Sequence, residues 1–420
     1  MGSRIEEFHP EKTSMVVDVT EIRSPFDFNG LESLLKNLDG NSNGISLGAN
    51  GMPNFQQPFD YKQFKFGQSN PTYMITDASG KQFVLRRKPL PNNKLVSKSA
   101  HAIEREFFML FGINVCNKDA APHRIVPVPE VYLLCEDESH IGFVFYLMEY
   151  IDGRQIKNPS MPGMNQQDSL AHWQAIMQTI TAIHSIDANK LVRCLPAKHF
   201  PQFQPEKLAK PLTSSYFQRQ IRTLSAVAAG QSKVVKPIPH FEKLCQWLLE
   251  NAPKDPLKLT LIHGDFKIDN VLFYPNEPKI AAVLDWELCT FGHPSFDLAN
   301  FLQPFQLPNQ LNQLLYKPDK TDMGIEKPGS LDSVYDKLAL YQKNLGYNWN
   351  DEDPKNNPVD LWNVGFVFGL VRLCVISQGI AMRVAKGNAS SGEASGYANL
   401  YPYLAKLAVE TIEKPPESKM

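Results

Sequence analysis

Apolar residues recur every three or four positions in several stretches of the chain, the spacing typical of helices that bury one face. The first stretch is Ile22 to Leu38, whose leucines fall at three- and four-residue steps. Further helical stretches are residues 100–110, 170–186, 216–229 and 241–249. A long helical segment is also predicted for residues 359–386. Because Arg372 and Gln378 interrupt its apolar run, we expect a buried helix and not a membrane span.

Shorter apolar segments in the first part of the chain predict strands. These segments are residues 64–66, 73–76, 82–88, 126–134 and 142–150. In the segment 82–88, alternation places Val84 and Arg86 on one face, and Phe83 and Leu85 on the other. Residues 39–58 are rich in Asn, Gly and Pro, which predicts a loop or linker.

Polar residues suited to phosphoryl transfer flank two further apolar segments. Asp265 is followed five residues later by Asn270, and Asp285 stands twenty residues beyond Asp265. Transfer from ATP needs a carboxylate that orients the attacking hydroxyl, and an amide oxygen plus a carboxylate that hold Mg²⁺ against the phosphates. The apolar runs after Asn270 and before Asp285 predict two short strands, which would hold both groups at one cleft. ATP and Mg²⁺ are therefore the expected cofactors.

The motif His-Gly-Asp-x-x-x-x-Asn at 263–270, with Asp285 in Asp-Trp-Glu, resembles the catalytic segments of the aminoglycoside phosphotransferase and choline kinase-like superfamily. The resemblance implies an α+β, bilobal protein-kinase-like fold with a small antiparallel β lobe and a larger, mainly helical lobe. The expected parts are an N-terminal helix and linker (1–58), a small nucleotide-binding lobe (59–150), a large catalytic and substrate lobe (151–412) and a flexible tail (413–420).

The small lobe is expected to bind the nucleotide. The turn at 67–72 contains Ser69 and Asn70, and the N–H groups and hydroxyl of such a turn can cradle phosphate, although most turns of this kind are only turns. Val84 and Arg86 have the spacing of an apolar residue that packs on adenine and a cation that reaches the phosphates. Arg replaces the usual Lys there, and it is longer and planar. The alternative for Arg86 is a solvated strand residue.

The remaining nucleotide contacts are implied by the resemblance. Glu106 matches the glutamate that pairs with the strand cation, whereas Glu104 is expected at the surface. The hinge would receive adenine through the Glu149 carbonyl and the Ile151 N–H. Met148 would stand at the back of the pocket, although a buried Met belongs to the core more often than to a cofactor site.

Roles in catalysis are assigned to the central motif. Asp265 is the candidate base that orients the acceptor hydroxyl, and Asn270 and Asp285 are the candidate Mg²⁺ ligands. The resemblance places Lys267 at the γ-phosphate. His263 is expected to support the loop, and Asp269 to contact solvent or to hydrogen-bond within the loop. His184 is expected to pack or to cap its helix. By the resemblance, Asp297 in the segment 292–299 braces the catalytic loop.

Four further segments resemble the kinase half of long acyl-CoA dehydrogenase fusion proteins: 67–72, 99–106, 148–154 and 378–383. The likeness extends from Pro25 to Leu404, and the dehydrogenase half is absent. It implies phosphorylation of the hydroxyl of a small molecule, with a 4-hydroxyacyl-CoA of fatty-acid or hydroxy-acid catabolism favoured. Arg372 and Arg383 are then candidates for a CoA phosphate or an acyl carboxylate, and a surface or paired arginine is the simpler interpretation of each.

Two alternatives stay open. An aminoglycoside or a choline-like alcohol is less favoured as acceptor, because a cationic substrate needs a cluster of acids and the Asp and Glu content after Asp297 is modest. The other alternative is a catalytically silent module that binds nucleotide or acyl-CoA.

Composition narrows the class further. Lys and Arg number 43 against 44 Asp and Glu, so the net charge of −1 argues against a nucleic-acid-binding protein. Six cysteines without a Cys-x-x-Cys pair indicate a reduced compartment and no metal–thiolate site. The tripeptide Ser418-Lys419-Met420 is similar to the Ser-Lys-Leu peroxisomal address. A peroxisomal location through an import receptor is therefore expected, with the cytoplasm as the alternative.

Overall fold

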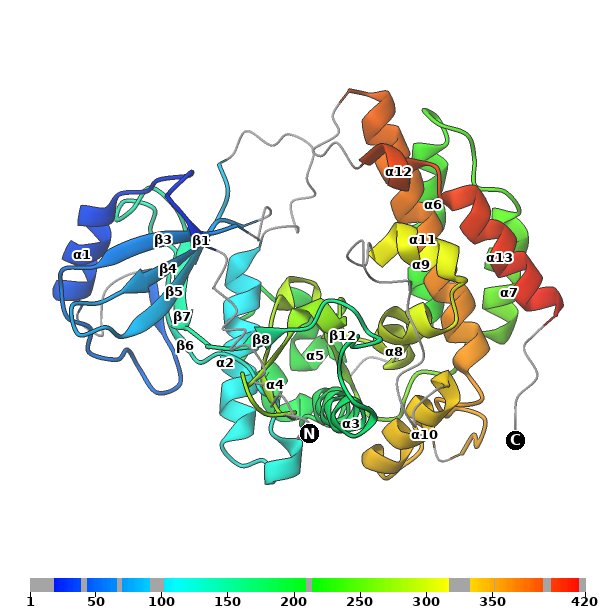
Figure 1. Ribbon diagram of the computed structural model, residues 1–420, viewed down its shortest axis with the longest axis horizontal. Helices are drawn as coiled ribbons and strands as arrows, with labels where there is room; N and C mark the ends of the chain where they lie inside the picture. Colours follow the sequence, from blue (N-terminus) through cyan, green and yellow to red (C-terminus); the bar gives the residue numbers. More distant parts are fainter. Residues whose placement is uncertain are drawn as a thin grey trace, which may run out of the picture.

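The computed structural model has two lobes, one built on an antiparallel sheet and one larger and mainly helical (Figure 1). It describes residues 19–38, 44–65, 70–90, 102–208, 214–316, 333–350, 352–387 and 394–414. The bilobal α+β class expected from the sequence is confirmed, while the lobe boundaries at 58, 150 and 412 stay predictions.

A seven-stranded sheet forms the small lobe. Its strand order is β1-β3-β4-β5-β7-β6-β2, and all neighbouring strands are antiparallel. The strands are β1 (Val19–Thr20), β2 (Ile45–Leu47), β3 (Asp60–Phe64), β4 (Thr72–Thr76), β5 (Gln82–Arg87), β6 (Val131–Cys135) and β7 (Phe145–Glu149). Every segment predicted as a strand contributes one, but β6 begins later than expected because Pro127 and Pro129 cannot donate to the ladder.

The N-terminal part differs from its prediction in two places. Helix α1 (Phe28–Lys36) begins six residues after Ile22, because the Asp27 side chain caps it by accepting a 2.9 Å hydrogen bond from Gly30 N. The expected linker 39–58 contains β2, which pairs with β6 at the edge of the sheet. The linker prediction is wrong at β2, since an edge strand depends on a distant partner and leaves little local signal.

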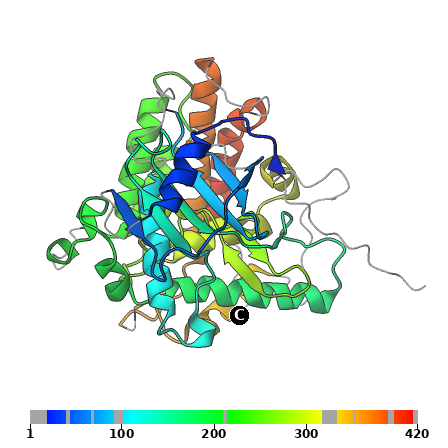
Figure 2. The same ribbon diagram turned by 90° about the vertical axis from the view of Figure 1, so that its left-hand side faces the viewer.

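The two faces of the sheet are covered by different helices. Helix α1 packs on one face, against a buried cluster that includes Phe83 and Leu85 of β5. Figure 2, in which the small lobe faces the viewer, shows α1 lying across the sheet. Helix α2 (Ile103–Asn117) contacts β6 and β7 on the other face. The alternation predicted for β5 is confirmed, because Arg86 reaches Glu106 of α2 at 3.2 Å.

The large lobe is built around α11 (Trp362–Ala385), which contacts α6, α7, α8, α12 and α13. The helices of this lobe are α3 (Gln166–His184), α4 (Ala188–Arg193), α5 (Pro205–Leu208), α6 (Tyr216–Gln231), α7 (Phe241–Asn251), α8 (Ser295–Leu302), α9 (Asn309–Tyr316), α10 (Val334–Leu345), α12 (Ala394–Ala398) and α13 (Tyr401–Glu413). In the described residues, α11 is the one helix whose length and composition would also suit a membrane span, but 72% of its apolar window is buried in the lobe. The prediction of a buried helix is confirmed.

Two small sheets lie at the junction of the lobes and frame the central motif. One has the order β11-β10-β8 and the other pairs β9 with β12. Their strands are β8 (Arg154–Gln155), β9 (Leu261–Ile262), β10 (Val271–Phe273), β11 (Ile280–Val283) and β12 (Thr290–Phe291). The strands predicted after Asn270 and before Asp285 are therefore present as β10 and β11. Single 3₁₀ turns, η3 (Ile268–Asn270) and η4 (Trp286–Leu288), follow the central loop and Asp285. The other 3₁₀ turns are η1 (Pro122–Arg124), η2 (Pro201–Phe203) and η5 (Gln303–Phe305).

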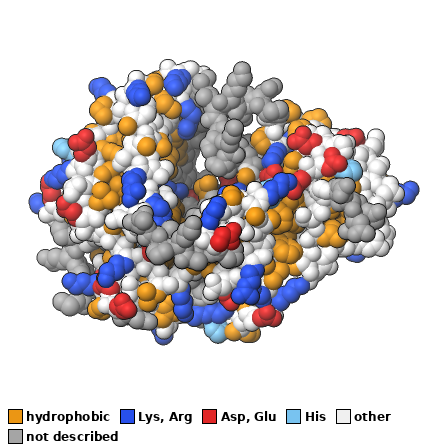
Figure 3. Space-filling view, turned by 180° about the vertical axis from the view of Figure 1, so that it is seen from behind, with side chains coloured by type: hydrophobic (Ala, Val, Ile, Leu, Met, Phe, Trp, Pro, Cys, Tyr) orange, Lys and Arg blue, Asp and Glu red, His pale blue; other side chains and the backbone are white. Residues whose placement is uncertain are grey.

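The surface agrees with the near-zero net charge. Figure 3 shows basic and acidic side chains interspersed with apolar ones on the face that it draws. A continuous basic stripe of the kind that binds nucleic acid is not seen on the described part of that face.

Candidate active site

The loop between β9 and β10 contains the central motif, and its first turn requires glycine. Gly264 has φ +85°, a left-handed value that costs other residues free energy. A Cβ at this position would lie 2.3 Å from the carbonyl oxygen of Leu288. The chain therefore turns sharply just before Asp265, whose N–H donates to His263 Nδ1 over 3.2 Å.

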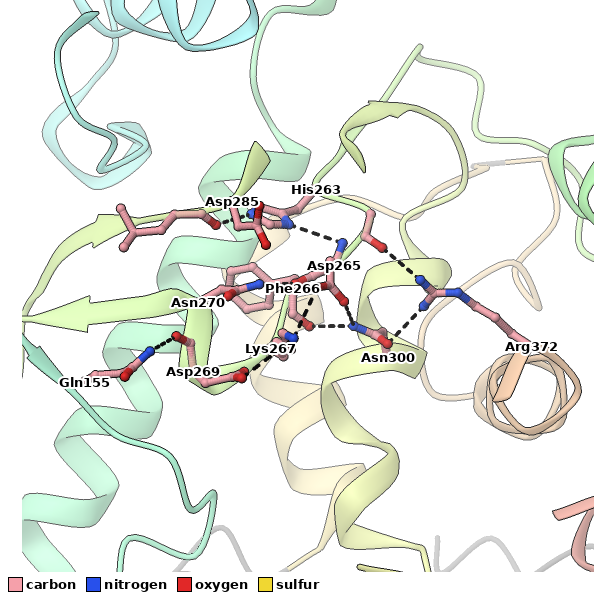
Figure 4. Close-up of polar contacts among 12 residues, drawn as sticks. Gln155, His263, Asp265, Phe266, Lys267, Asp269, Asn270, Asp285, Asn300 and Arg372 are labelled. Carbon is pink, nitrogen blue, oxygen red and sulfur yellow. Dashed lines mark hydrogen bonds and ion pairs between the residues drawn. The ribbon is translucent and has the colours of Figure 1, made fainter. Parts of the chain in front are cut away.

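The polar contacts of Asp265 come from three segments (Figure 4). Lys267 Nζ lies 3.3 Å from Asp265 Oδ2. Asn270 Nδ2 donates to the Asp265 carbonyl over 2.9 Å and reaches Oδ2 at 3.5 Å. Asn300 Nδ2, on α8, reaches Oδ1 at 3.4 Å. Each oxygen of the Asp265 carboxylate thus has at least one side-chain nitrogen within 3.5 Å.

Lys267 and Asp269 form an ion pair beside Asp265. Lys267 Nζ is 3.6 Å from Asp269 Oδ2. Burial lowers the pKa of Lys267, but the carboxylates of Asp265 and Asp269 outweigh this and raise it. Lys267 consequently stays cationic in the site. Asp269 was expected to contact solvent or the loop. Its ion pair with Lys267 is a contact within the loop.

Asp297 of α8 holds the loop from beneath. Its carboxylate accepts hydrogen bonds from His263 N at 2.6 Å and Gly264 N at 2.8 Å. His184 Nε2 lies 3.2 Å from Asp297 Oδ2, and its Nδ1 is 2.8 Å from the hydroxyl of Tyr341. Burial opposes ionisation of Asp297, but the hydrogen bond and charge of His184 outweigh it and lower the pKa of this carboxyl. These contacts agree with the expected bracing role of Asp297.

His263 is fixed within the loop. It is fully buried, and its Nε2 lies 3.0 Å from the carbonyl oxygen of Leu284. Burial lowers the pKa of the imidazole, which favours the neutral ring. With the tautomer protonated on Nε2, its Nδ1 can accept from the Asp265 N–H. Nδ1 is used inside the loop and Nε2 ties the loop to the segment before Asp285, in agreement with a supporting role.

Asp285 faces the strand cation across the cleft. It has φ +67°, in the left-handed region that Asp tolerates better than most residues. Arg86 Nη2 lies 3.3 Å from Asp285 Oδ1 and 3.6 Å from Glu287 Oε2. The Asp285 carboxylate therefore forms an ion pair with Arg86 of the small lobe.

Arg86 joins three carboxylates of two lobes. Its Nε is 3.2 Å from Glu106 Oε2, which is the predicted strand–helix pair. Burial raises the pKa of Glu106, the charges of Asp285 and Glu287 raise it further, and Arg86 opposes both. Burial also disfavours the Arg86 cation, but the surrounding carboxylates raise its pKa above the ordinary value. The alternative of a solvated Arg86 is wrong.

Glu104 was expected at the surface and is instead buried, with 7% of its surface exposed. Its Oε1 is paired with Lys88 Nζ at the end of β5. Glu104 lies on a different face of α2 from the buried Met109, but Lys88, just after β5, covers that face as well.

Asn70 approaches the segment after Asp285. It is fully buried, and its Nδ2 donates to Glu287 Oε2 over 3.2 Å. The turn is therefore tied to the same acidic group as Arg86. Ser69, predicted beside it, lies outside the described residues.

The expected hinge follows β7. Met148 pairs with Val84 across the sheet and is half-buried. The Glu149 side chain accepts a 3.1 Å hydrogen bond from Glu130 N. The expected bond between the Glu149 carbonyl and adenine stays a prediction. Ile151 is likewise half-buried, in the segment that leads to the large lobe.

A pocket of about 140 Å³ opens beside Asp265 between α8 and α11. Its apolar wall consists of Phe296, Ala299, Phe368, Gly369, Leu373 and Ile376. The polar lining residues other than Asp265 are Asn300, Gln303 and Arg372. Asp265 is thus the single acid among the residues that line this pocket.

The donor set of Asn270 and Asp285 fits Mg²⁺. Because Asn270 Nδ2 is engaged with Asp265, its amide oxygen is the atom left for a cation. An amide oxygen and a carboxylate are hard donors, as Mg²⁺ prefers. The described residues contain no group of three or more His, Cys, Asp or Glu side chains that could hold a metal.

Comparison with known proteins identifies the family. A profile described as the phosphotransferase enzyme family matches residues 60–319, over half of the chain, which includes Arg86, the central loop, Asp285 and α8 but not the α11 side of the pocket. The chain belongs to this family. The superfamily resemblance drawn from the His-Gly-Asp motif is confirmed.

One similar phosphotransferase-like region is part of a longer protein. The chain is 36% identical over 359 residues to acyl-CoA dehydrogenase family member 10 of Mus musculus, covering 85% of this chain and 30% of the relative. It spans 40% of other curated relatives, such as acyl-CoA dehydrogenase family member 11 of Homo sapiens. The expected likeness to the kinase half of such fusions is confirmed.

Solved structures of the phosphotransferase family share the fold. A protein from Ralstonia eutropha JMP134, assigned provisionally as an aminoglycoside phosphotransferase, has a TM-score of 0.67 at 28% identity, covering 92% of this chain and 98% of that one. The ADP-bound aminoglycoside phosphotransferase APH(2'')-Ib has a TM-score of 0.51 at 14% identity, covering 91% and 99%. The second likeness concerns the fold alone.

Three polar residues of this phosphotransferase site were not assigned a part in it from the sequence. His184 was interpreted as packing, yet it pairs with Asp297. Glu287 receives both Arg86 and Asn70. Asn300 could have been found, because it stands one helical turn after Asp297 and therefore faces the same loop. His184 and Glu287 carry no such local signal.

Proposed function

We propose that this phosphotransferase transfers the γ-phosphate of Mg·ATP to a hydroxyl group of a small molecule. The observation that carries the proposal is the convergence of Asp265, Asn270 and Asp285 at one junction, facing the Arg86–Glu106 pair of the small lobe. Family membership supports the class of reaction.

Asp265 is proposed to accept the hydrogen bond of the acceptor hydroxyl and to orient its oxygen for in-line attack. A base of this kind contributes roughly 10²–10⁴-fold to the rate. Its carboxylate lines the pocket between α8 and α11, so an alcohol in that pocket is within its reach. The ammonium of Lys267, 3.3 Å away, would offset negative charge on the transferring phosphoryl group.

Asn270 and Asp285 are proposed to hold Mg²⁺. When bound, the ion neutralises charge on the phosphates. Arg86, Val84 and Met148 line the opposite side of the junction on β5 and β7, which supports nucleotide binding by the small lobe. Arg86 would exchange part of its contact with Asp285 for phosphate oxygens, since its guanidinium can fork between acceptors.

The lining of the pocket favours an apolar acceptor over a cationic one. Phe296, Phe368, Leu373 and Ile376 supply aromatic and aliphatic surface. A polycationic aminoglycoside or choline would gain from several acids, and Asp265 is the single one in the lining. We therefore favour a hydroxylated acyl chain. The curated relatives are named as acyl-CoA dehydrogenase family members, which supports an acyl-CoA thioester as the form of that chain, and we propose 4-hydroxyacyl-CoA.

A peroxisomal location remains part of the proposal. It rests on Ser418-Lys419-Met420 of the sequence, which lie outside the described residues. Fatty-acid catabolism in that compartment would supply hydroxyacyl chains. A fluorescent fusion at the N-terminus with and without the last three residues tests it, and a cytosolic signal from the intact chain would contradict it.

The alternative is a silent module that binds nucleotide or acyl-CoA without transfer. Mass spectrometry separates the two. The protein is incubated with Mg·ATP and one of four compounds: 4-hydroxyacyl-CoA, the free hydroxy acid, choline or kanamycin. Gain of one phosphate on the thioester, absent with Asp265→Asn and retained with the exposed control Asp60→Asn, supports the proposal. Transfer to another compound keeps the kinase and removes the acyl-CoA assignment. ATP binding without transfer to any of the four favours the silent module.

A further inference from the structure

We propose that Arg372 of α11 is a positioning residue, which fixes the orientation of Asp265 through Asn300 and through the Gly264 carbonyl. The inference rests on the proposed function, because it concerns the base of that reaction. It replaces the expectation that Arg372 binds a CoA phosphate or an acyl carboxylate.

The contacts of Arg372 lead from one helix across another to the loop (Figure 4). Its Nη1 donates to Asn300 Oδ1 over 3.0 Å. Asn300 in turn donates through Nδ2 to the Phe266 carbonyl at 3.1 Å and reaches Asp265 Oδ1 at 3.4 Å. The guanidinium also lies 4.7 Å from the centre of the Phe296 ring, a cation–π contact with a side chain of α8.

The guanidinium decides which way the Asn300 amide faces. Arg has donors and no acceptor, so it can bind only the oxygen of that amide. The nitrogen of Asn300 must then face the loop, where both groups within reach are acceptors: the Phe266 carbonyl and the Asp265 carboxylate. Without Arg372, the Asn300 oxygen would lose its donor, and the side chain could move away from the loop and withdraw its N–H from the carboxylate. Arg372 therefore keeps a donor on Asp265 Oδ1.

The second contact of Arg372 fixes the peptide that precedes the base. Its Nη2 donates to the Gly264 carbonyl over 3.3 Å. Asp297 accepts from the N–H of the same residue at 2.8 Å. Gly264, which has no side chain to restrict its backbone, is thus held at both polar groups by α8 and α11. The carbonyl of the Gly264–Asp265 peptide is thus held from α11, while its N–H donates to His263 Nδ1 within the loop.

Such fixation matters because Asp265 acts by position. A misplacement of about 1 Å in a reacting group can cost roughly 100-fold in rate. The two oxygens of Asp265 are distinguished by Asn300 on Oδ1 and Lys267 on Oδ2. We expect the carboxylate to rotate or to sample more orientations when the Arg372–Asn300 contact is lost.

A double-mutant cycle separates positioning from substrate binding. The variants are Arg372→Met, Asn300→Ala and the double variant, assayed for kcat and acceptor KM with the acceptor that the wild type phosphorylates. Because Arg372 reaches the loop both through Asn300 and through the Gly264 carbonyl, we expect each single change to lower kcat roughly 10- to 100-fold and the double change to cost clearly less than the product of the two single losses. The acceptor KM should change less than threefold. Arg372→Lys, which keeps the positive charge but has one nitrogen in place of the two that contact Asn300 and Gly264, should fall between the wild type and Arg372→Met.

Controls and contrary outcomes are as follows. Arg222→Met, on the exposed part of α6, should keep wild-type kcat and KM. Thermal unfolding checks that the variants fold, and Arg372→Lys serves if Arg372→Met does not. Independent losses in kcat, or a large rise in acceptor KM with unchanged kcat, would overturn the positioning role while the kinase proposal stands. A wild type that transfers phosphate to no acceptor overturns the proposed function, and this inference with it.

Discussion

Replacing Asp297 with asparagine tests how the catalytic loop is held. The native carboxylate is fully buried and accepts from His263 N, Gly264 N and His184 Nε2. Asparagine has the same shape but only one acceptor atom. Its NH₂ group would face at least one of these donors. The change therefore removes hydrogen bonds and a charge while leaving the packing of α8 in place.

The cost can be estimated from those contacts. A hydrogen bond to a charged group contributes about 1.5–3 kcal/mol, and a buried donor without a partner costs about 1–3 kcal/mol. Removing one partner of a buried ion pair typically destabilises by about 3–5 kcal/mol. We expect Asp297→Asn to lie in that range. For a chain of this length unfolding as a unit, the loss corresponds to a fall in Tm of roughly 3–6 °C.

Two measurements check the prediction. Thermal unfolding gives the global effect, with Asp60→Asn as a control that is exposed in β3 and should change stability by less than about 0.5 kcal/mol. Amide hydrogen exchange gives the local effect, because His263 and Gly264 should lose protection. A Tm equal to that of the control, with unchanged protection of both amides, would refute the bracing role of Asp297.

Three further predictions concern the surroundings of the site. Arg86→Met leaves the buried Glu106 without its cation and should destabilise by about 3–5 kcal/mol in urea unfolding, so an unchanged midpoint would contradict the ion pair. Gly264→Ala should abolish transfer and lower Tm more than Gly80→Ala, which has similar positive φ but open space around its Cβ; equal effects would argue against the Leu288 contact. Burial lowers the pKa of His293 to about 3, so below pH 6.5 the unfolded chain takes up a proton that the folded chain does not, and stability should fall by up to about 1.4 kcal/mol per pH unit. His293→Gln should flatten that fall between pH 6.5 and 5 in urea titrations, and an unchanged slope would exclude His293 as its source.

Strand alternation, apolar runs and motif spacing predicted the parts of the site that depend on local structure. The alternation of β5 placed Arg86 on the inner face, and apolar runs placed β10 and β11 between Asn270 and Asp285. Asp265, Asn270 and Asp285 were found because their spacing along the chain reflects the loop and turn that hold them. The structure brings these residues together, and their roles are predictions that the transfer assay tests.

Tertiary packing explains what the sequence did not predict. Glu104 is polar and lies off the main apolar face of α2, so periodicity placed it in solvent. The end of β5 brings Lys88 over it, which no pattern within the helix reveals. In the same way, β2 forms because β6 offers an edge, and His184 joins the site because α3 passes beneath Asp297.

Helix α8 connects these observations, because two of its residues contact the loop one turn apart. Asp297 can only accept, and it faces the backbone N–H groups of His263 and Gly264. Asn300 donates, and it faces the Phe266 carbonyl and the Asp265 carboxylate. The loop thus meets an acceptor where it presents donors and a donor where it presents acceptors. If Asp297 and Asn300 were exchanged, a carboxylate would face the Phe266 carbonyl and the Asp265 carboxylate, and an amide would face the two backbone N–H groups. The order of Asp and Asn along α8 therefore matches the hydrogen-bonding groups that the loop presents and helps to orient the base.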